Sequence, residues 1–294
     1  MADPILAPVG PARRRLVSAA GAARLRWWAS VSVAAVIVLA VVFVPLFAEL
    51  DQRIVHLDDR LLGPSPAHPL GTDELGRDTL LRCVYGMRVS LLVGVVAAVV
   101  STVIGTVVGA TAGALGGWTD RVLARLVDVL ASVPHLLLGI ILVALFRPGP
   151  GAVIVSVGLT HWLSTARIVR AEVMSLRTRP FVDAAIAGGA SRRRVTMRHF
   201  VPNVAPQAAL AAVLAVPHAI WHESALSFLG LGMPPHLASL GTMIEDGRQA
   251  LLTGHWWPAF APGLFIVVPT LAIAGLAGAW RERIDPRGPG ELRL

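Results

Sequence analysis

The stretch FVDAAIAGGASRRRVTMRHFVP, residues 181–202, decides how the rest of this 294-residue chain is arranged. It lies between two long apolar segments, but it carries four arginines, a Gly-Gly pair and a terminal proline. A membrane-spanning helix does not hold so many charges, so we place this stretch in water. Its sequence predicts two short helices: Pro180 suits the start of the first, the Gly-Gly pair ends it, and Ser191 caps a second helix that Pro202 is expected to stop.

One side of this stretch is built from small residues and is flanked by positive charge. Small side chains let another surface approach closely, and Asp183 adds a negative charge to the first turn of the first helix. The small residues are Ala184, Ala185, Gly188 and Gly189, and the flanking arginines are Arg192, Arg193, Arg194 and Arg198. We interpret the stretch as a docking element for another protein. The alternative is a solvated arginine-rich loop that only fixes the topology.

The order Asp183-Ala184-Ala185, then Gly189, then His199-Phe200-Val201-Pro202 resembles the EAA loop of ATP-binding-cassette importer permeases. The resemblance implies that residues 172–203 form a cytoplasmic coupling loop, whose helix sits in a cleft of a partner ATPase. Two residues depart from the family pattern. Asp183 stands where Glu is usual and keeps the charge, whereas His199 replaces a commonly aliphatic residue and leaves the packing at the end of the loop open.

The composition of the chain is that of a membrane protein. Hydrophobic residues make up 55% of the sequence and charged residues only 15%, and the mean hydropathy is +0.67. The net charge of +8 would also suit a nucleic-acid partner, but the basic residues are all arginines and cluster in the loops of one side. Membrane topology explains that clustering better than nucleic acid does. The single cysteine, Cys83, cannot form a disulfide within the chain.

Apolar segments predict an all-α integral membrane protein with six transmembrane helices. The expected spans are residues 27–47, 89–115, 122–146, 152–169, 204–231 and 259–280. The first of them lies between a basic cytoplasmic tail, residues 1–26, and an extracytoplasmic segment, residues 48–87. The other five belong to a permease core at 88–280, followed by a cytoplasmic tail at 281–294. With both termini inside, 19 of the 26 arginines fall on the cytoplasmic side.

Three features inside the spans point to packing or transport. Gly105, Gly109 and Gly113 recur every four residues, which lets a neighbouring helix approach the backbone, in this chain or in a partner subunit. His161 and Glu223 are polar groups at membrane depth and are candidates for the translocation path. For His161 a satisfied interior histidine is the alternative, and for Glu223 a structural bond to a neighbouring helix.

Further sequence strings extend the resemblance over residues 27–286, nearly the whole chain. HPLGTDELGRD at 68–78 and GMRVSL at 86–91 resemble the segment before the second helix in dipeptide, oligopeptide and nickel permeases. The sequences at 128–138 and 223–232 are similar to the same class. Residues 71–78 also echo a phosphate-binding loop, but the lysine and the hydroxyl that such a loop needs are absent. A metal site is less favoured there than turns and helix caps; its candidate ligands are His56, His68, Asp73 and Asp78.

The resemblance implies the type I ABC importer permease fold and the role of the second permease subunit in a dipeptide-type system. Its partners would be a related permease, two cytoplasmic ATP-binding subunits, an extracytoplasmic solute-binding protein and membrane lipid, with no nucleic acid. The chain contains no recognised catalytic motif, so we expect no catalytic residue, metal or cofactor in it, and ATP with magnesium on the partner ATPases. Both termini would lie on the cytoplasmic side of the plasma membrane.

The sequence does not decide the cargo, and it leaves two other classes of protein as alternatives. Di- or oligopeptides are the leading cargo, and nickel or haem import by the same architecture is the alternative. An ATP-independent secondary transporter would need an inverted repeat or intramembrane charges, and the sequence offers only Glu223. An intramembrane hydrolase would need a serine paired with His218 or His222, at a spacing that no known motif supports.

Overall fold

A computed structural model describes residues 11–51, 53–234 and 237–284, and within these ranges it contains helices and no β-strand. The long helices are α1 (Pro11–Phe47), α2 (Thr79–Leu115), α5 (Pro150–Leu176), α8 (Val201–Phe228) and α10 (Trp257–Ile284). The shorter ones are η1 (Leu57–Asp59), α3 (Gly117–Ala131), α4 (His135–Ala144), α6 (Pro180–Ala187), α7 (Arg192–Val195), the π-helical turn Thr196–Phe200 and α9 (Leu240–Leu252).

Five of these helices are long and apolar enough to cross a membrane. The remaining expected span, residues 122–146, which is the third along the chain, is broken. Its two helices, α3 and α4, together pass the same test but are bent by 85°. Ser132, Val133 and Pro134 form the break, because proline lacks the N–H that a helix requires and disfavours helical geometry in the residue before it. The sequence predicted one continuous span over residues 122–146, and the structure shows a corner at Pro134.

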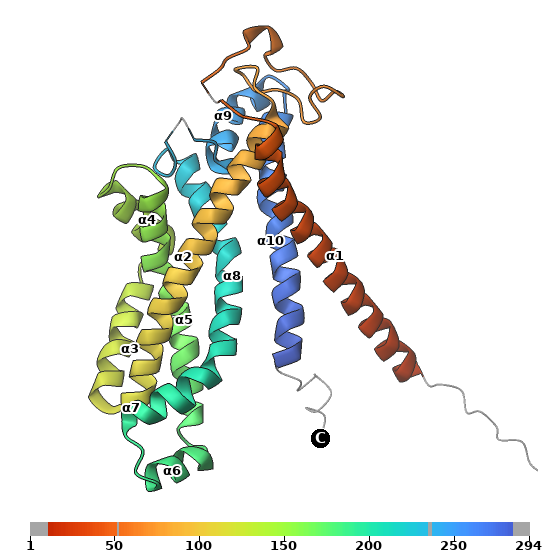
Figure 1. Cartoon of the computed structure of the whole chain (residues 1–294). Helices are drawn as coiled ribbons and strands as arrows, with labels where there is room; N and C mark the ends of the chain where they lie inside the picture. The colour runs from red at the N-terminus through yellow and green to blue at the C-terminus, as the bar shows by residue number, and fades with distance from the viewer. Residues whose placement is uncertain (1–10, 52, 235–236, 285–294) are drawn as a thin grey trace, which may run out of the picture.

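The bundle is built around α2, which packs mainly against α5 and α8 (Figure 1). Buried aliphatic residues fill the space between these three helices, among them Val93, Val157 and Leu226. In Figure 1 α1 leans away from the bundle, and it touches the rest of the chain chiefly through α10. Only 6% of its most apolar stretch is buried within the chain, so most of its surface is left for lipid or another subunit.

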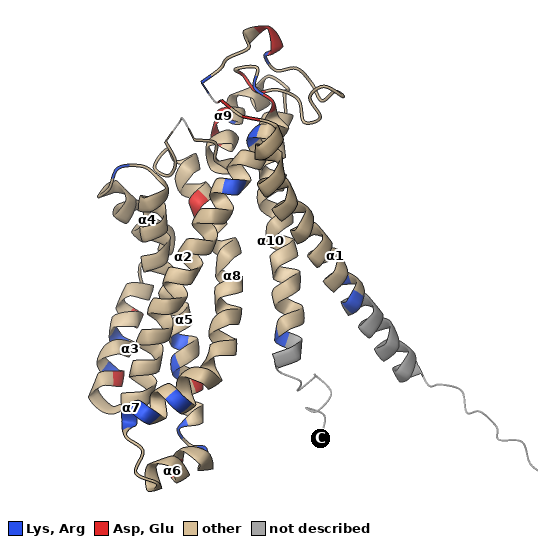
Figure 2. Ribbon diagram, viewed as in Figure 1, with Lys and Arg blue, Asp and Glu red and all other residues tan. Residues whose placement is uncertain are grey.

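The two ends of the bundle differ in composition. The segment 48–78 and α9 cover one end, whereas α6, α7, the first turns of α1 and the last turns of α10 lie at the other (Figure 1). Arginines gather at this second end, around α3, α5 and α7, as Figure 2 shows. The docking element and the two ends of the described chain therefore share one side of the bundle.

Several helix boundaries differ from those expected: α1 begins at Pro11 and not at 27, and α5 ends at Leu176 and not at 169. Two further differences bear on the sites described below. First, α2 begins at Thr79, ten residues before the expected start at 89, so the segment expected to be extracytoplasmic includes its first turns. Asp78 caps this helix by accepting a hydrogen bond from the backbone N–H of Leu81 at 2.8 Å. Second, Pro202 does not stop a helix: α7, the π turn and α8 run on as one helical stretch, Arg192–Phe228.

The π turn explains why Pro202 is tolerated. The backbone N–H of Val201 bonds to the carbonyl of Thr196, five residues back, so the helix widens just before the proline. Pro202 then lies in the first turn of α8, where a missing N–H and the ring of proline cost little. The expectation that this proline ends the helix was wrong for that reason.

Candidate functional site

The docking element, residues 180–202, forms the two short helices expected. Pro180 begins α6, and Gly188 ends it. Gly189 follows with a φ of +82°, a backbone conformation that favours glycine. The Ser191 side chain then caps α7 by accepting a hydrogen bond from the Arg194 N–H at 3.3 Å.

This element is held to the bundle by apolar contacts. Val182 of α6, Val195 of α7 and Phe200 of the π turn are each at most 4% exposed, and they pack with Val169 and Val204 of α5 and α8. Burial of this kind fixes the element without directional bonds. It leaves the opposite side of α6 free for another protein.

The exposed side carries the residues that the sequence singled out. Asp183, Ala184, Gly188, Gly189, Arg192, Arg193, Arg194 and Arg198 are exposed, and Ala185 is half-buried. Sequence reasoning missed the large apolar side chains beside them: Phe181, Ile186 and Met197 are 42%, 58% and 62% exposed. Apolar groups surrounded by charge are typical of a protein-binding surface. The presence of Phe181 and Ile186 in a stretch already placed in water was the signal available in the sequence.

Ion pairs brace the bundle above the docking element. The Arg170 guanidinium of α5 donates two hydrogen bonds to the Asp120 carboxylate of α3, at 2.5 and 2.7 Å. Arg167 of α5 bonds to Asp128 of α3 at 3.0 Å. These pairs lie at a cavity of about 310 Å³ between α2, α3 and α5. Neither pair could be predicted from the sequence, because the partners lie about 40 to 50 residues apart.

The three glycines of α2 lie against α5 of the same chain. A Cβ atom at Gly105 would stand 2.6 Å from the Trp162 carbonyl oxygen, and one at Gly109 would stand 2.4 Å from that of Ala166. At Gly113 it would meet the side chain of Val173 at 2.8 Å. No side chain fits at such distances, so the glycine repeat sets how closely α2 and α5 approach.

Glu223 is completely buried and is bonded by serines from three elements. Its carboxylate accepts hydrogen bonds from the hydroxyls of Ser90 in α2 at 2.5 Å, Ser227 in α8 at 2.8 Å and Ser239 before α9 at 2.9 Å. Ser224 adds a longer contact at 3.4 Å. These bonds favour the structural alternative for Glu223: the carboxylate ties α2, α8 and the start of α9 together and is covered by the described residues around it.

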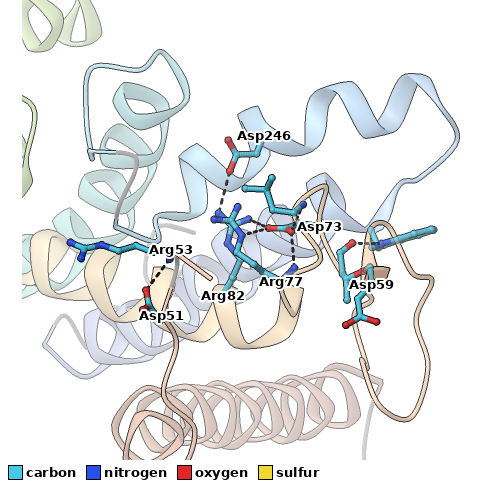
Figure 3. A network of polar contacts seen from close by, with 10 residues as sticks. Asp51, Arg53, Asp59, Asp73, Arg77, Arg82 and Asp246 are labelled. Carbon is cyan, nitrogen blue, oxygen red and sulfur yellow. Dashed lines mark hydrogen bonds and ion pairs between the residues drawn. The ribbon is translucent and has the colours of Figure 1, made fainter. Parts of the chain in front are cut away.

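A second polar anchor holds the segment 48–78 to the bundle (Figure 3). The Asp73 carboxylate accepts hydrogen bonds from Arg77 Nε at 2.7 Å and from the buried guanidinium of Arg82. Arg82 also bonds to Asp246 of α9 at 3.2 Å, so α2 and α9 share this anchor as well. The backbone N–H groups of Leu75 and Arg77 donate to the same Asp73 side chain, at 2.8 and 2.9 Å.

The residues considered for a metal site serve as turns and caps. His68 Nδ1 lies 2.9 Å from an oxygen of Asp78, which caps α2, and Asp73 belongs to the anchor just described. The side chain of His56 is exposed, and its backbone N–H donates to the Leu75 carbonyl oxygen at 3.0 Å. Over the described ranges, no three His, Cys, Asp or Glu side chains are placed to hold one metal ion.

His161 lies in a group of aromatic rings near the middle of α5. Its ring stacks on that of His135 with 5.6 Å between centroids and meets the ring of His222 edge to face at 4.6 Å. Trp221 lies edge to face with His222 at 5.1 Å. Sequence reasoning did not connect these residues, because they come from α4, α5 and α8.

Apolar helices of spanning length, with a docking element at one end, define a membrane-embedded component of a larger transport machine. The model of the family described as "binding-protein-dependent transport system inner membrane component" matches residues 105–287. The chain belongs to this family and is a multi-pass membrane protein with the family's permease fold.

Named relatives resemble the chain over most of its length. The dipeptide transport system permease protein DppC of Bacillus subtilis is 38% identical over 79% of this chain and 72% of its own length. The oligopeptide transport system permease protein OppC of Escherichia coli K12 is 40% identical over 88% of this chain and 87% of its own length. A probable peptide ABC transporter permease protein of Sinorhizobium fredii is 40% identical over 83% and 82%, respectively.

Proposed function

We propose that this chain is one of two permease subunits of an ATP-driven importer that carries di- or oligopeptides delivered by an extracytoplasmic solute-binding protein. Relatives that cover most of the chain are permease proteins of dipeptide and oligopeptide transport systems. The observation that carries the proposal is the docking element, whose apolar residues anchor it while its small and charged residues stay exposed. The assembly would contain a related permease and two ATP-binding subunits, which bind ATP and magnesium and perform the hydrolysis.

The proposal includes an orientation in the membrane. The arginines around α3, α5 and α7 favour the cytoplasm for this end, as the positive-inside rule describes (Figure 2). The docking element would then meet the ATPases in the cytoplasm, and both termini would lie there. The segment 48–78 and α9 would meet the solute-binding protein outside.

A mechanical route for coupling follows from the helix connections. The continuous stretch Arg192–Phe228 joins the docking element directly to Glu223, which in turn is bonded to α2 and the start of α9. A push of the ATPases on α6 would thus reach the far end through one helix. Such a push biases a bundle between inward-open and outward-open states when the ATPases contact the two states differently.

Peptide cargo is favoured over nickel or haem. The relatives named above are peptide permeases, and the described side chains offer no three-residue metal site. An ATP-independent secondary transporter is a weaker alternative, because the docking element would have no partner to meet.

Uptake of a labelled dipeptide tests the proposal in cells that lack this chain. Wild type is expected to restore uptake, and a Gly189→Trp variant is expected to lose it while still reaching the membrane. A Gly117→Trp variant is the matched control, because both glycines have a positive φ, +82° and +57°, and a Cβ atom added at either would have no other atom within 4 Å. Gly117 is exposed at the start of α3, outside residues 180–202.

Two results would contradict the proposal. Failure of wild type to restore uptake, while another peptide importer works in the same cells, would remove the peptide assignment. Equal uptake by Gly189→Trp and wild type would remove the docking role of residues 180–202, because a bulky ring there points into open space beside this chain and acts on a partner.

A further inference from the structure

Four histidines gather on one face of the bundle at membrane depth. His135 begins α4, His161 lies near the middle of α5, and His218 and His222 are one turn apart on α8. The first two rings stack, and His161 meets His222 edge to face, with centroids 4.6 Å apart. Trp221, which is 55% exposed, lies edge to face with His222. We call the four histidine rings and this indole the histidine face.

This face is not covered by any described part of the chain. His135 and His218 are exposed, and His161 and His222 are half-buried. Histidines within membrane spans face protein or water, because an imidazole nitrogen without a partner in hydrocarbon is costly. The nearby charged side chains are engaged elsewhere: Glu223 is bonded by serines, and Arg167 by Asp128. The histidine face therefore presents polar groups without a fixed charge.

The hydrogen bonds of His161 and His218 determine which ring nitrogen remains able to accept a hydrogen bond from another molecule. His161 Nδ1 lies 3.0 Å from the Val157 carbonyl oxygen, and His218 Nδ1 lies 3.0 Å from that of Leu214. His161 Nδ1 also lies 2.9 Å from the Thr160 hydroxyl, which itself donates to the Val157 carbonyl oxygen at 3.2 Å and so can accept from an Nδ1–H group. A carbonyl oxygen only accepts, so we assign the proton to Nδ1 in both rings. In the neutral ring the opposite nitrogen, Nε2, is then an acceptor. Both rings thus offer an acceptor whose orientation is fixed by the helix itself.

We propose that the histidine face lines the translocation path and accepts hydrogen bonds from the N–H groups of the passing peptide. This inference rests on the proposed peptide import. Every peptide carries N–H donors, in its amides and its terminal ammonium, whatever its side chains are. Uncharged acceptors suit such a cargo, because a fixed charge would hold peptides of the opposite sign and repel those of the same sign.

Thiol labelling of the assembled complex in membranes tests the location without reference to the cargo. The natural Cys83 is fully buried, so the wild-type chain is the unlabelled reference. His161→Cys and His218→Cys variants are expected to react with a membrane-impermeant thiol reagent, because a path admits water. Absence of labelling at both positions, with ATP present and absent, would overturn the location.

Uptake of labelled dialanine tests the hydrogen bonds. His161→Phe and His218→Phe keep a planar ring but remove the acceptor, and each is expected to lower uptake by up to about tenfold. The Gln variants keep an acceptor oxygen and are expected to retain most of the uptake. Trp28→Phe, at a ring of α1 that is 56% exposed, is the control. The ATP hydrolysis rate of the complex shows whether each variant still assembles.

The outcomes separate this inference from the proposed function. Phe variants that transport like wild type, or Gln variants that fail as the Phe variants do, would overturn the hydrogen-bonding role. If wild type imports no peptide while the His161→Cys and His218→Cys variants are labelled, the assignment of a peptide cargo is wrong, but the inference of a water-filled path along this face stands.

Discussion

The two ends of this molecule are held together by different kinds of interaction. At the end formed by the segment 48–78 and α9, buried charges make directional bonds: Asp73 with Arg82, and Glu223 with serines of α2 and α8. In the docking element, Val182, Val195 and Phe200 are buried by apolar contact, and the charged groups of residues 180–202 are left in water. Directional bonds define one geometry, whereas apolar contact tolerates small shifts. The comparison indicates that the first end keeps its own shape, and that the second is completed by a partner.

Loss of Arg82 is expected to have the largest effect on the stability of the chain. Arg82→Ala leaves the buried Asp73 carboxylate with one arginine fewer, and breaking a buried pair costs about 3–5 kcal/mol. We expect the free energy of unfolding of the purified chain in detergent to fall by that amount. Limited proteolysis should then cut the segment 48–78 before any other part of the chain. Equal protection of this segment in the variant and in wild type would show that the anchor is dispensable.

The Glu223 cluster is expected to have the next largest effect. Glu223→Ala removes the acceptor of three short hydrogen bonds from serine hydroxyls, and we expect a loss of about 3 kcal/mol in the free energy of unfolding. Glu223→Gln keeps one acceptor oxygen and should lose roughly half as much. Thermal unfolding of the two variants, measured at one pH in one detergent, shows which of them is the more stable. A Gln variant less stable than the Ala variant would rule out the bonding role.

The smallest effect on stability is expected at the docking end. Arg193→Glu reverses an exposed charge that makes no ion pair among the described residues, so the free energy of unfolding should change by no more than about 0.5 kcal/mol. ATP-driven uptake is expected to fall nevertheless, because the partner meets the wrong charge. Uptake and thermal unfolding measured on the same preparation separate the two effects. A clear loss of stability in this variant would contradict the difference between the ends.

The two short helices of residues 180–202 could be predicted from the sequence because their signals are local. The Gly188-Gly189 pair, the Ser191 cap and the flanking arginines all act within a few residues of one another. The glycine repeat of α2 also indicated close packing, although the sequence did not say that α5 is its partner. Helix caps, turns and spacing are properties of neighbouring residues, and the fold follows them closely here.

The features that the sequence did not reveal depend on residues far apart in the chain. Ser90 and Glu223 are 133 residues apart, and Arg82 and Asp246 are 164 apart. The first turns of α2 were missed for another reason: they contain Arg82 and Arg88, so hydropathy hides a helix that the Asp78 cap begins. The expectation that Pro202 ends a helix was wrong, because a proline in a first helical turn and a proline that ends a helix look alike in sequence.

The π turn at Thr196–Phe200 is the place in the stretch Arg192–Phe228 where one residue can be removed without rotating the rest of α8. A π turn holds one more residue than the α-helical turn it replaces, and each residue of an α-helix advances the helix by about 100°. Removing one residue here would convert the π turn into an α-helical turn and leave α8 close to its present phase. The same deletion between this turn and His218 would rotate the serine-bonded carboxylate and two of the histidines by about 100°, away from their present neighbours.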